Sequence, residues 1–124
     1  MRLPAAFTAT GKAMLSTLAD ADVDSLYGKK PLEGLTPRSV RSLPALKRQL
    51  RDVRRLGYSI DDGETREGMY SFGAPVLNRT GSTAVAGVAL SFFRAELNEQ
   101  RARQAIATVK ELAQSLSLRA ASLH

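Results

Sequence analysis

The sequence of 124 residues contains no cysteine, and its one histidine is His124. The lack of cysteine excludes a disulfide-stapled fold, thiolate zinc sites and a cysteine nucleophile. With a single histidine, serine–histidine triads, histidine-rich metal sites and most general-base chemistry at neutral pH are not expected. We therefore predict no metal site and no cofactor, and a protein that binds a partner rather than an enzyme.

Long hydrophobic runs are also missing. No apolar run approaches the roughly 18 residues needed to span a bilayer, and residues 1–4 lack the apolar core of a secretory signal. Apolar residues make up 44% of the chain and charged residues 24%, which is typical of a globular domain. The 18 Lys and Arg exceed the 12 Asp and Glu by six, so the formal charge is +6. We expect one cytoplasmic domain with no membrane association.

Helical periodicity dominates the first half of the chain. One helix is predicted to begin near Thr8 or Thr10, where a hydroxyl can cap its first turn. A short second helix is predicted to be capped by Asp20 or Asp22 and to end at Gly28. This second helix is expected to present Val23, Leu26 and Tyr27 as its apolar residues.

A third helix is predicted between Ser42 and Gly57, with an apolar stripe and a basic face. The stripe consists of Leu43, Leu46, Leu50, Val53 and Leu56, and the basic face of Lys47, Arg48, Arg51, Arg54 and Arg55. Seven Lys and Arg residues and one acid lie from Arg38 to Arg55. A solvated surface or a contact with another subunit is the favoured interpretation, because no aromatic residues or base-reading motif accompany the charges. Binding to nucleic-acid phosphates is the alternative.

After Gly57 the periodicity changes from helical to alternating. Residues 58–60 are predicted to form a short strand, and residues 61–64 a turn. Two longer strands, over residues 69–77 and 83–93, are predicted to form an antiparallel hairpin.

Asn98 is predicted to cap a long last helix. Its inner stripe consists of Ala102, Ala105, Ile106, Val109, Leu112, Ala113 and Leu116. Helices that flank an antiparallel sheet make an α+β domain. Three strands form a narrow sheet with at least one open edge, so the chain is expected to be part of a larger domain or to complete its sheet with another chain.

The two faces of the predicted hairpin differ in side-chain size. The bulky face consists of Tyr70, Phe72, Ala74, Val76, Ala86, Val88, Leu90 and Phe92. The opposite face consists of Ser71, Gly73, Pro75, Gly87, Ala89 and Ser91. Small side chains leave room above a sheet, and two hydroxyls suit a compact polar ligand. Alternatively, a helix packs unusually close there, as glycine and alanine permit.

Two further segments have both an ordinary and a functional interpretation. The acidic segment from Asp61 to Glu64 lacks the ligand spacing of a calcium loop, so a solvated turn is favoured, although Asp61 is placed to reach the mouth of a pocket. Residues 8–12 open a helix with small residues that suit an anion. Ala6 stands where a phosphate-binding loop needs glycine, so a helix cap and a close-packing glycine explain this segment equally well.

Taken in order, these segments resemble IclR-type transcriptional regulators. The resemblance is carried by Leu3-Pro4 with residues 8–15, by residues 35–40, by residues 57–64 and by residues 68–76. They are similar to the family stretches LPxxATALGKALL, LTPRTI, GYxxDxEE and GxxCxAAPV, and together they cover essentially the whole chain.

The resemblance implies a C-terminal effector-binding domain with a GAF-like antiparallel sheet, part of which is missing from residues 1–124. It implies a small organic or aromatic acid as the effector and self-association to a dimer or tetramer. DNA is then bound only through a winged helix-turn-helix domain that is absent here. Carried over position by position, the implied ligand-binding residues are Ala9, Thr10, Asp61, Ser71, Ala89 and Ser91. Since Ala89 is often serine in the family, a less polar effector is expected.

Overall fold

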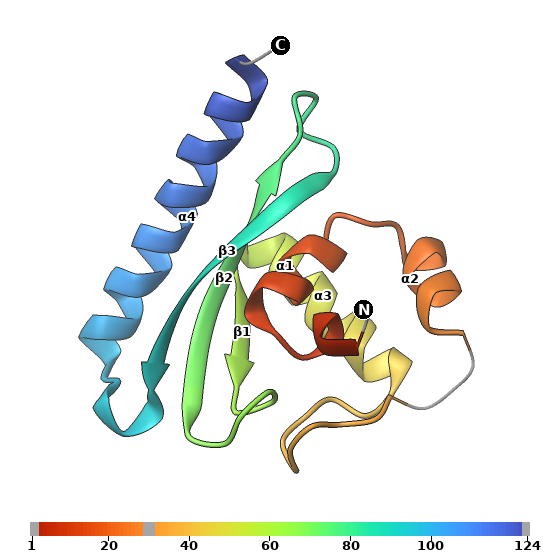
Figure 1. The fold of residues 1–124 in the computed structure, drawn as a ribbon, viewed down its shortest axis with the longest axis vertical. Helices are drawn as coiled ribbons and strands as arrows, with labels where there is room; N and C mark the ends of the chain where they lie inside the picture. The colour runs from red at the N-terminus through yellow and green to blue at the C-terminus, as the bar shows by residue number, and fades with distance from the viewer. Residues whose placement is uncertain (1–2, 29–31, 123–124) are drawn as a thin grey trace.

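The computed structural model describes residues 3–28 and 32–122. Within them, an antiparallel sheet lies between two helical layers (Figure 1). The long helix α4 (Glu99–Ser122) covers one face of the sheet, and the helices of the first half of the chain lie on the other side. This is the predicted α+β fold. His124 falls outside the described residues.

The sheet has three strands in the order β1-β2-β3: β1 (Ser59–Asp62), β2 (Met69–Leu77) and β3 (Ala84–Phe93). The hairpin of β2 and β3 forms as predicted, with Ser71 opposite Ser91. The predicted bounds of the first strand are wrong, because it continues through both aspartates, which pair with β2 rather than turning away from it. The turn begins only at Gly63, whose φ of +70° suits a residue without Cβ.

Two short helical segments begin the chain. The 3₁₀ helix η1 (Leu3–Ala6) precedes α1 (Ala9–Leu15), which starts at the predicted place. The Thr8 hydroxyl caps α1, because its oxygen accepts a hydrogen bond of 2.9 Å from the Gly11 N–H.

The second helix, α2 (Asp20–Tyr27), ends at Gly28 as predicted. The predicted cap is wrong: Ala19 is the N-cap residue, and no side chain caps this end, because both aspartates lie inside the first turn. Leu26, one of the three apolar residues that this helix was expected to present, is 63% exposed. A helix of two turns buries only a narrow stripe, and here that stripe is centred on Val23.

The third helix, α3 (Leu43–Leu56), has the predicted bounds and cap. The Ser42 hydroxyl accepts from the Ala45 N–H at 3.2 Å, and Gly57 ends the helix with a φ of +85°. Its buried stripe packs with η1, α1 and α2 in a first hydrophobic cluster, formed by Ala6, Phe7, Leu15, Val23, Val40, Leu46 and Leu50.

A second hydrophobic cluster joins the sheet to α4. Its buried members are Phe72, Ala74, Ala105, Val109 and Ala113. The Asn98 side chain caps α4 as predicted, accepting from the Arg101 N–H at 2.8 Å, and the 3₁₀ turn η2 (Arg94–Glu96) leads into it. Leu112 does not belong to the buried stripe: it is 43% exposed, because α4 extends along a sheet too narrow to cover its flank.

The outer edge of β3 has no neighbouring strand among the described residues. The hydrogen bond from the Arg94 N–H to the Gly68 carbonyl fixes the alternation of the ladder. By that alternation Ser71 and Ser91 form a non-hydrogen-bonded pair, so the backbone groups of Ala89 and Ser91 point outward at the open edge. The predicted open edge is therefore the long edge of β3.

Candidate functional site

A cavity of about 250 Å³ lies between the start of α1 and the small-residue face of the sheet. It is lined by Thr8, Ala9, Thr10, Asp61, Thr65, Arg66, Met69, Ser71, Ala89 and Ser91. All six residues proposed from the sequence are in this set, although they come from four separate elements, α1, β1, β2 and β3. The structure thus brings the proposed site together in one place.

Close packing of α1 places the cavity where it is. A Cβ added to Gly73 would lie 2.5 Å from the Ala9 carbonyl oxygen, so only glycine permits this approach. At Gly87 an added Cβ would lie 3.0 Å from the Thr10 carbonyl oxygen. The helix therefore rests on the sheet over the two glycines and leaves space over the serines. The close-packing interpretation of the small face is confirmed over the glycines, and its ligand-binding interpretation stays a prediction for the part with the serines.

Asp61 organises the turn that forms one wall of the cavity. Its Oδ1 accepts from the backbone N–H groups of Glu64 at 2.8 Å and Thr65 at 3.3 Å. Its Oδ2 accepts from the Thr65 hydroxyl at 2.7 Å. The residue is 6% exposed, and both of its carboxylate oxygens are already hydrogen bonded. The main role of Asp61 is therefore to stabilise the conformation of the turn.

The hydroxyls of Ser71 and Ser91 hydrogen bond to each other across the strands, with 2.7 Å between the two Oγ atoms. In such a pair one hydroxyl donates and the other accepts, so one O–H remains free to donate elsewhere. The pair therefore offers a ligand one donor and the remaining lone pairs. Ala89, their neighbour on β3, adds no polar group.

Four lining residues were not found from the sequence: Thr8, Thr65, Arg66 and Met69. The last three lie in or directly after the turn that joins β1 to β2, beyond the segment Asp61–Glu64 that was interpreted as a solvated turn. Thr65 and Arg66 follow that segment directly, and Met69 begins the predicted strand 69–77. Thr8 belongs to the segment 8–12 that was interpreted either as a helix cap or as an anion site, and the structure shows it as the cap of α1.

A buried ion pair fastens α1 to the same turn. The Lys12 ammonium contacts the Glu64 carboxylate and donates to the Ile60 carbonyl at 3.2 Å. Glu64 also accepts from the Val40 N–H at 2.8 Å through Oε1. Burial lowers the pKa of Lys12 below its ordinary value of 10.5, and the hydrogen bond and charge of Glu64 only partly offset this effect. This ion pair therefore connects α1 to the turn after β1, the two segments that form opposite walls of the cavity.

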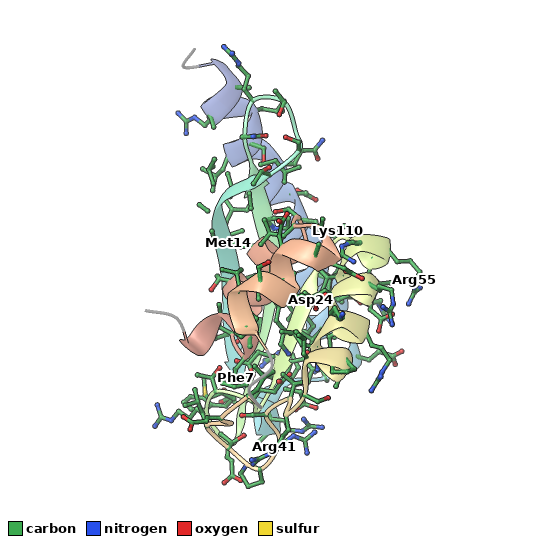
Figure 2. All side chains as sticks on the ribbon, turned by 90° about the vertical axis from the view of Figure 1, so that its right-hand side faces the viewer. Phe7, Met14, Asp24, Arg41, Arg55 and Lys110 are labelled. Atoms are coloured by element: carbon green, nitrogen blue, oxygen red, sulfur yellow. The ribbon has the colours of Figure 1, made fainter. Side chains whose placement is uncertain are left out.

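The basic face of α3 is largely engaged within the chain. Lys47 pairs with Asp24 of α2 at 2.9 Å, and Arg54 donates to the Ser16 carbonyl at 2.7 Å. Arg55 lies on the outer side of α3, away from the sheet (Figure 2), at 3.4 Å from Asp52. These contacts favour a mainly structural role for this face.

Two larger depressions lie elsewhere and contain none of the proposed residues. One, of about 560 Å³, lies beside the turn after β2 and the end of α4. The other, of about 390 Å³, lies between the sheet and the start of α4, where Arg94 stacks over the Tyr70 ring. In residues 3–28 and 32–122, no three His, Cys, Asp or Glu side chains gather closely enough to hold a metal ion. No helix described in the structure has the length and hydropathy to cross a bilayer.

Comparison with known proteins gives one consistent result. The family model described as "Bacterial transcriptional regulator IclR C-terminal" matches residues 1–118. The transcriptional repressor AllR of Klebsiella pneumoniae is 32% identical over 116 residues, which are 94% of this chain and 42% of AllR. These relatives are regulators of transcription and not enzymes, in agreement with the sequence prediction.

Solved structures agree with the family model. The repressor BlcR of Agobacterium tumefaciens superimposes with a TM-score of 0.88 at 40% identity, over 98% of this chain and 49% of that one. The inducer-binding domain of a PobR double mutant from Acinetobacter, in complex with 3-hydroxybenzoic acid, gives 0.82 at 28% identity, over 94% of this chain and 66% of that one. The chain therefore spans less than half of the full-length AllR and BlcR chains.

Proposed function

Because this chain belongs to the IclR family of bacterial transcriptional regulators and matches its C-terminal domain, we propose that it is a cytoplasmic effector-sensing domain. Its effector is a small organic or aromatic acid, held in the cavity between α1 and the sheet. The relative PobR supports this class of ligand, since its inducer-binding domain forms a complex with 3-hydroxybenzoic acid.

One observation carries the proposal: the six residues chosen from sequence line a single cavity. At about 250 Å³ the cavity is smaller than the 300–1,000 Å³ typical of drug-sized ligands, so the ligand is a compact molecule. The free O–H of the Ser71–Ser91 pair would donate to it from the sheet. The first backbone N–H groups of a helix have no partner inside that helix, and Ala9 and Thr10 are the first residues of α1.

Ligand binding would act on transcription through a shift between arrangements of the domain. An effector changes an equilibrium only by as much as its affinity differs between the two states. Here it would bridge α1 and the sheet, which carry the two sides of the cavity. The resulting change in subunit packing would alter the spacing of DNA-binding domains in the complete regulator.

A thermal-shift screen of small carboxylic and aromatic acids tests the proposal. A ligand present at 100 times its dissociation constant stabilises the folded chain by about 2.7 kcal/mol. We expect at least one compact acid to raise the melting temperature in a saturable way. If no acid does so, the proposed sensing function is wrong.

We also propose that the chain self-associates through the open edge of β3, and this interaction is the second candidate function. Residues 84–93 contain no charged residue and no proline, so the irregularity in pairing at Val85 is the one usual device that this edge carries. Val85 and Phe93 on β3 are 58% and 62% exposed. Pairing of β3 with β3 of a second copy would give a continuous antiparallel sheet. Light scattering would then report a dimer or tetramer without any small molecule.

A further inference from the structure

We propose that Arg66 determines the charge of the ligand by binding its carboxylate, an inference that rests on the proposed sensing function. Arg66 lies in the turn between β1 and β2 and is one of the residues that line the cavity. Among the ten described residues that line this cavity, it is the one basic residue. It also lies outside every motif that the sequence analysis selected.

The guanidinium of Arg66 makes no hydrogen bond and no ion pair with residues 3–28 or 32–122. The acidic residue on the same wall, Asp61, does not engage it, because both Asp61 oxygens accept hydrogen bonds from the turn itself. Arg66 is exposed and carries five N–H donors in a planar fork. Two parallel donors of this fork match the two oxygens of a carboxylate.

The backbone of the turn that carries Arg66 is held in place by hydrogen bonds. Asp61 binds the backbone N–H groups of Glu64 and Thr65, and Glu64 is held in turn by Lys12. The backbone directly before Arg66 is therefore anchored on the cavity side of the sheet. Its long side chain remains free to close over a ligand that has entered.

The other residues that line this cavity indicate the rest of the ligand. The Ser71–Ser91 pair offers one free O–H, which suits a hydroxyl or oxo group. Met69 and Ala89 add apolar side chains to the same lining. The combination fits a compact monocarboxylate with a second hydrogen-bonding group, such as an oxo acid or a hydroxylated aromatic acid.

Three probe pairs test the inference by calorimetric titration: 3-hydroxybenzoate, benzoate and pyruvate, each against its neutral primary amide. The variant is Arg66→Gln, with Arg66→Lys as the conservative replacement. Arg79→Gln is the matched control, because Arg79 is an exposed arginine in the turn after β2 and does not line this cavity.

We expect the wild type to prefer an acid to its amide, and Arg66→Gln to weaken that acid by about tenfold to a hundredfold, the range for a hydrogen bond to a charged group. Binding of the amide stays unchanged, Arg66→Lys retains part of the preference, and Arg79→Gln retains all of it. If Arg66→Gln binds the acid as tightly as the wild type, or if the wild type binds acid and amide equally, the role of Arg66 is wrong and the cavity proposal stands. If the wild type binds none of the six probes, both proposals are overturned.

Discussion

Lys12 of α1 and Glu64 of the turn after β1 form an ion pair in which the two side chains are only 1% and 6% exposed. The pair joins two segments that are 52 residues apart in the sequence and that form opposite walls of the candidate cavity. The Glu64 carboxylate also receives the Val40 N–H, so the loop before α3 is tied to the same point. One buried interaction therefore fixes the relative positions of three segments around the site.

Breaking this pair should strongly destabilise the fold. Removal of one partner leaves an uncompensated buried charge, which costs about 3–5 kcal/mol. We expect Lys12→Met and Glu64→Gln each to lower the free energy of unfolding by such an amount, and the double variant to lose less than the sum, because the two changes act on one interaction. Urea denaturation measures all three. The control is Arg103→Met, which breaks the exposed pair with Glu99 and should cost about 0.5 kcal/mol or less. Strict additivity of the two buried changes would contradict the pairing.

The titration of Lys12 should make stability rise with pH in the alkaline range. Burial lowers the pKa of Lys12 in the folded chain below the value of 10.5 that it has when unfolded. Between these two pKa values the unfolded chain binds more protons, so the free energy of unfolding increases as pH rises toward 10.5. We expect the stability difference between the wild type and Lys12→Met to grow over this range, as followed by urea denaturation at several pH values. A difference that shrinks would show that the pKa is raised instead.

Gly73→Ala should force α1 away from the sheet. The added Cβ would lie 2.5 Å from the Ala9 carbonyl oxygen and 2.7 Å from the Ser59 Oγ, closer than atoms approach without a shift. Overpacking of this kind costs about 1–3 kcal/mol. Gly87→Ala is the matched comparison, since its closest atom would lie at 3.0 Å and a small adjustment suffices. Denaturation should give the larger loss for Gly73→Ala. Equal losses would mean that the close approach is not the cause.

Ala89→Met should fill the cavity and abolish ligand binding. Ala89 lines the cavity from the edge strand, so a longer side chain there occupies the space of the ligand without entering a hydrophobic cluster. Ala86→Met on the opposite face of β3 is the control. With any acid found by the thermal-shift screen, we expect the melting-temperature increase to disappear in Ala89→Met and to persist in Ala86→Met. An unchanged increase in Ala89→Met would place the ligand elsewhere.

Charges on the edge of β3 should prevent self-association. Lysine on an edge strand disfavours pairing with a second strand. We expect the double variant Val85→Lys with Phe93→Lys to run as a monomer in light scattering, while its circular dichroism spectrum stays that of the wild type, since both residues are exposed. Leu118→Lys, on the exposed side of α4, controls for added charge. An unchanged oligomer would exclude this edge as the interface.

Local sequence chemistry predicts most of the elements correctly. Thr8, Ser42 and Asn98 each place a side-chain acceptor at a helix start, and all three accept the expected backbone hydrogen bond. The alternation of large and small residues assigned both faces of the hairpin. Such features depend on neighbours within a few positions, so they can be read from the chain before it folds.

The errors concern features that depend on distant partners. Asp61 and Asp62 have turn composition, yet they continue β1 because β2 pairs with them. Leu26 and Leu112 have the correct helical spacing, but no second surface reaches them. Local pattern specifies which residues are suited to be buried, and only the packing of the elements specifies which of them are.

The candidate site divides in the same way. Residue type and spacing along the chain were enough to identify the caps of α1, α3 and α4, the small face of the hairpin and the likeness to a family. Three features of the site depend on how distant segments pack: the hydrogen bonds of Asp61 within its own turn, the hydrogen bond between Ser71 and Ser91, and the place of Arg66 in the lining without a side-chain partner among the described residues. Hydrogen-bond partners and the space between elements depend on segments that are far apart in the sequence and pack together in the fold. A local sequence pattern contains no information about which distant segments will meet.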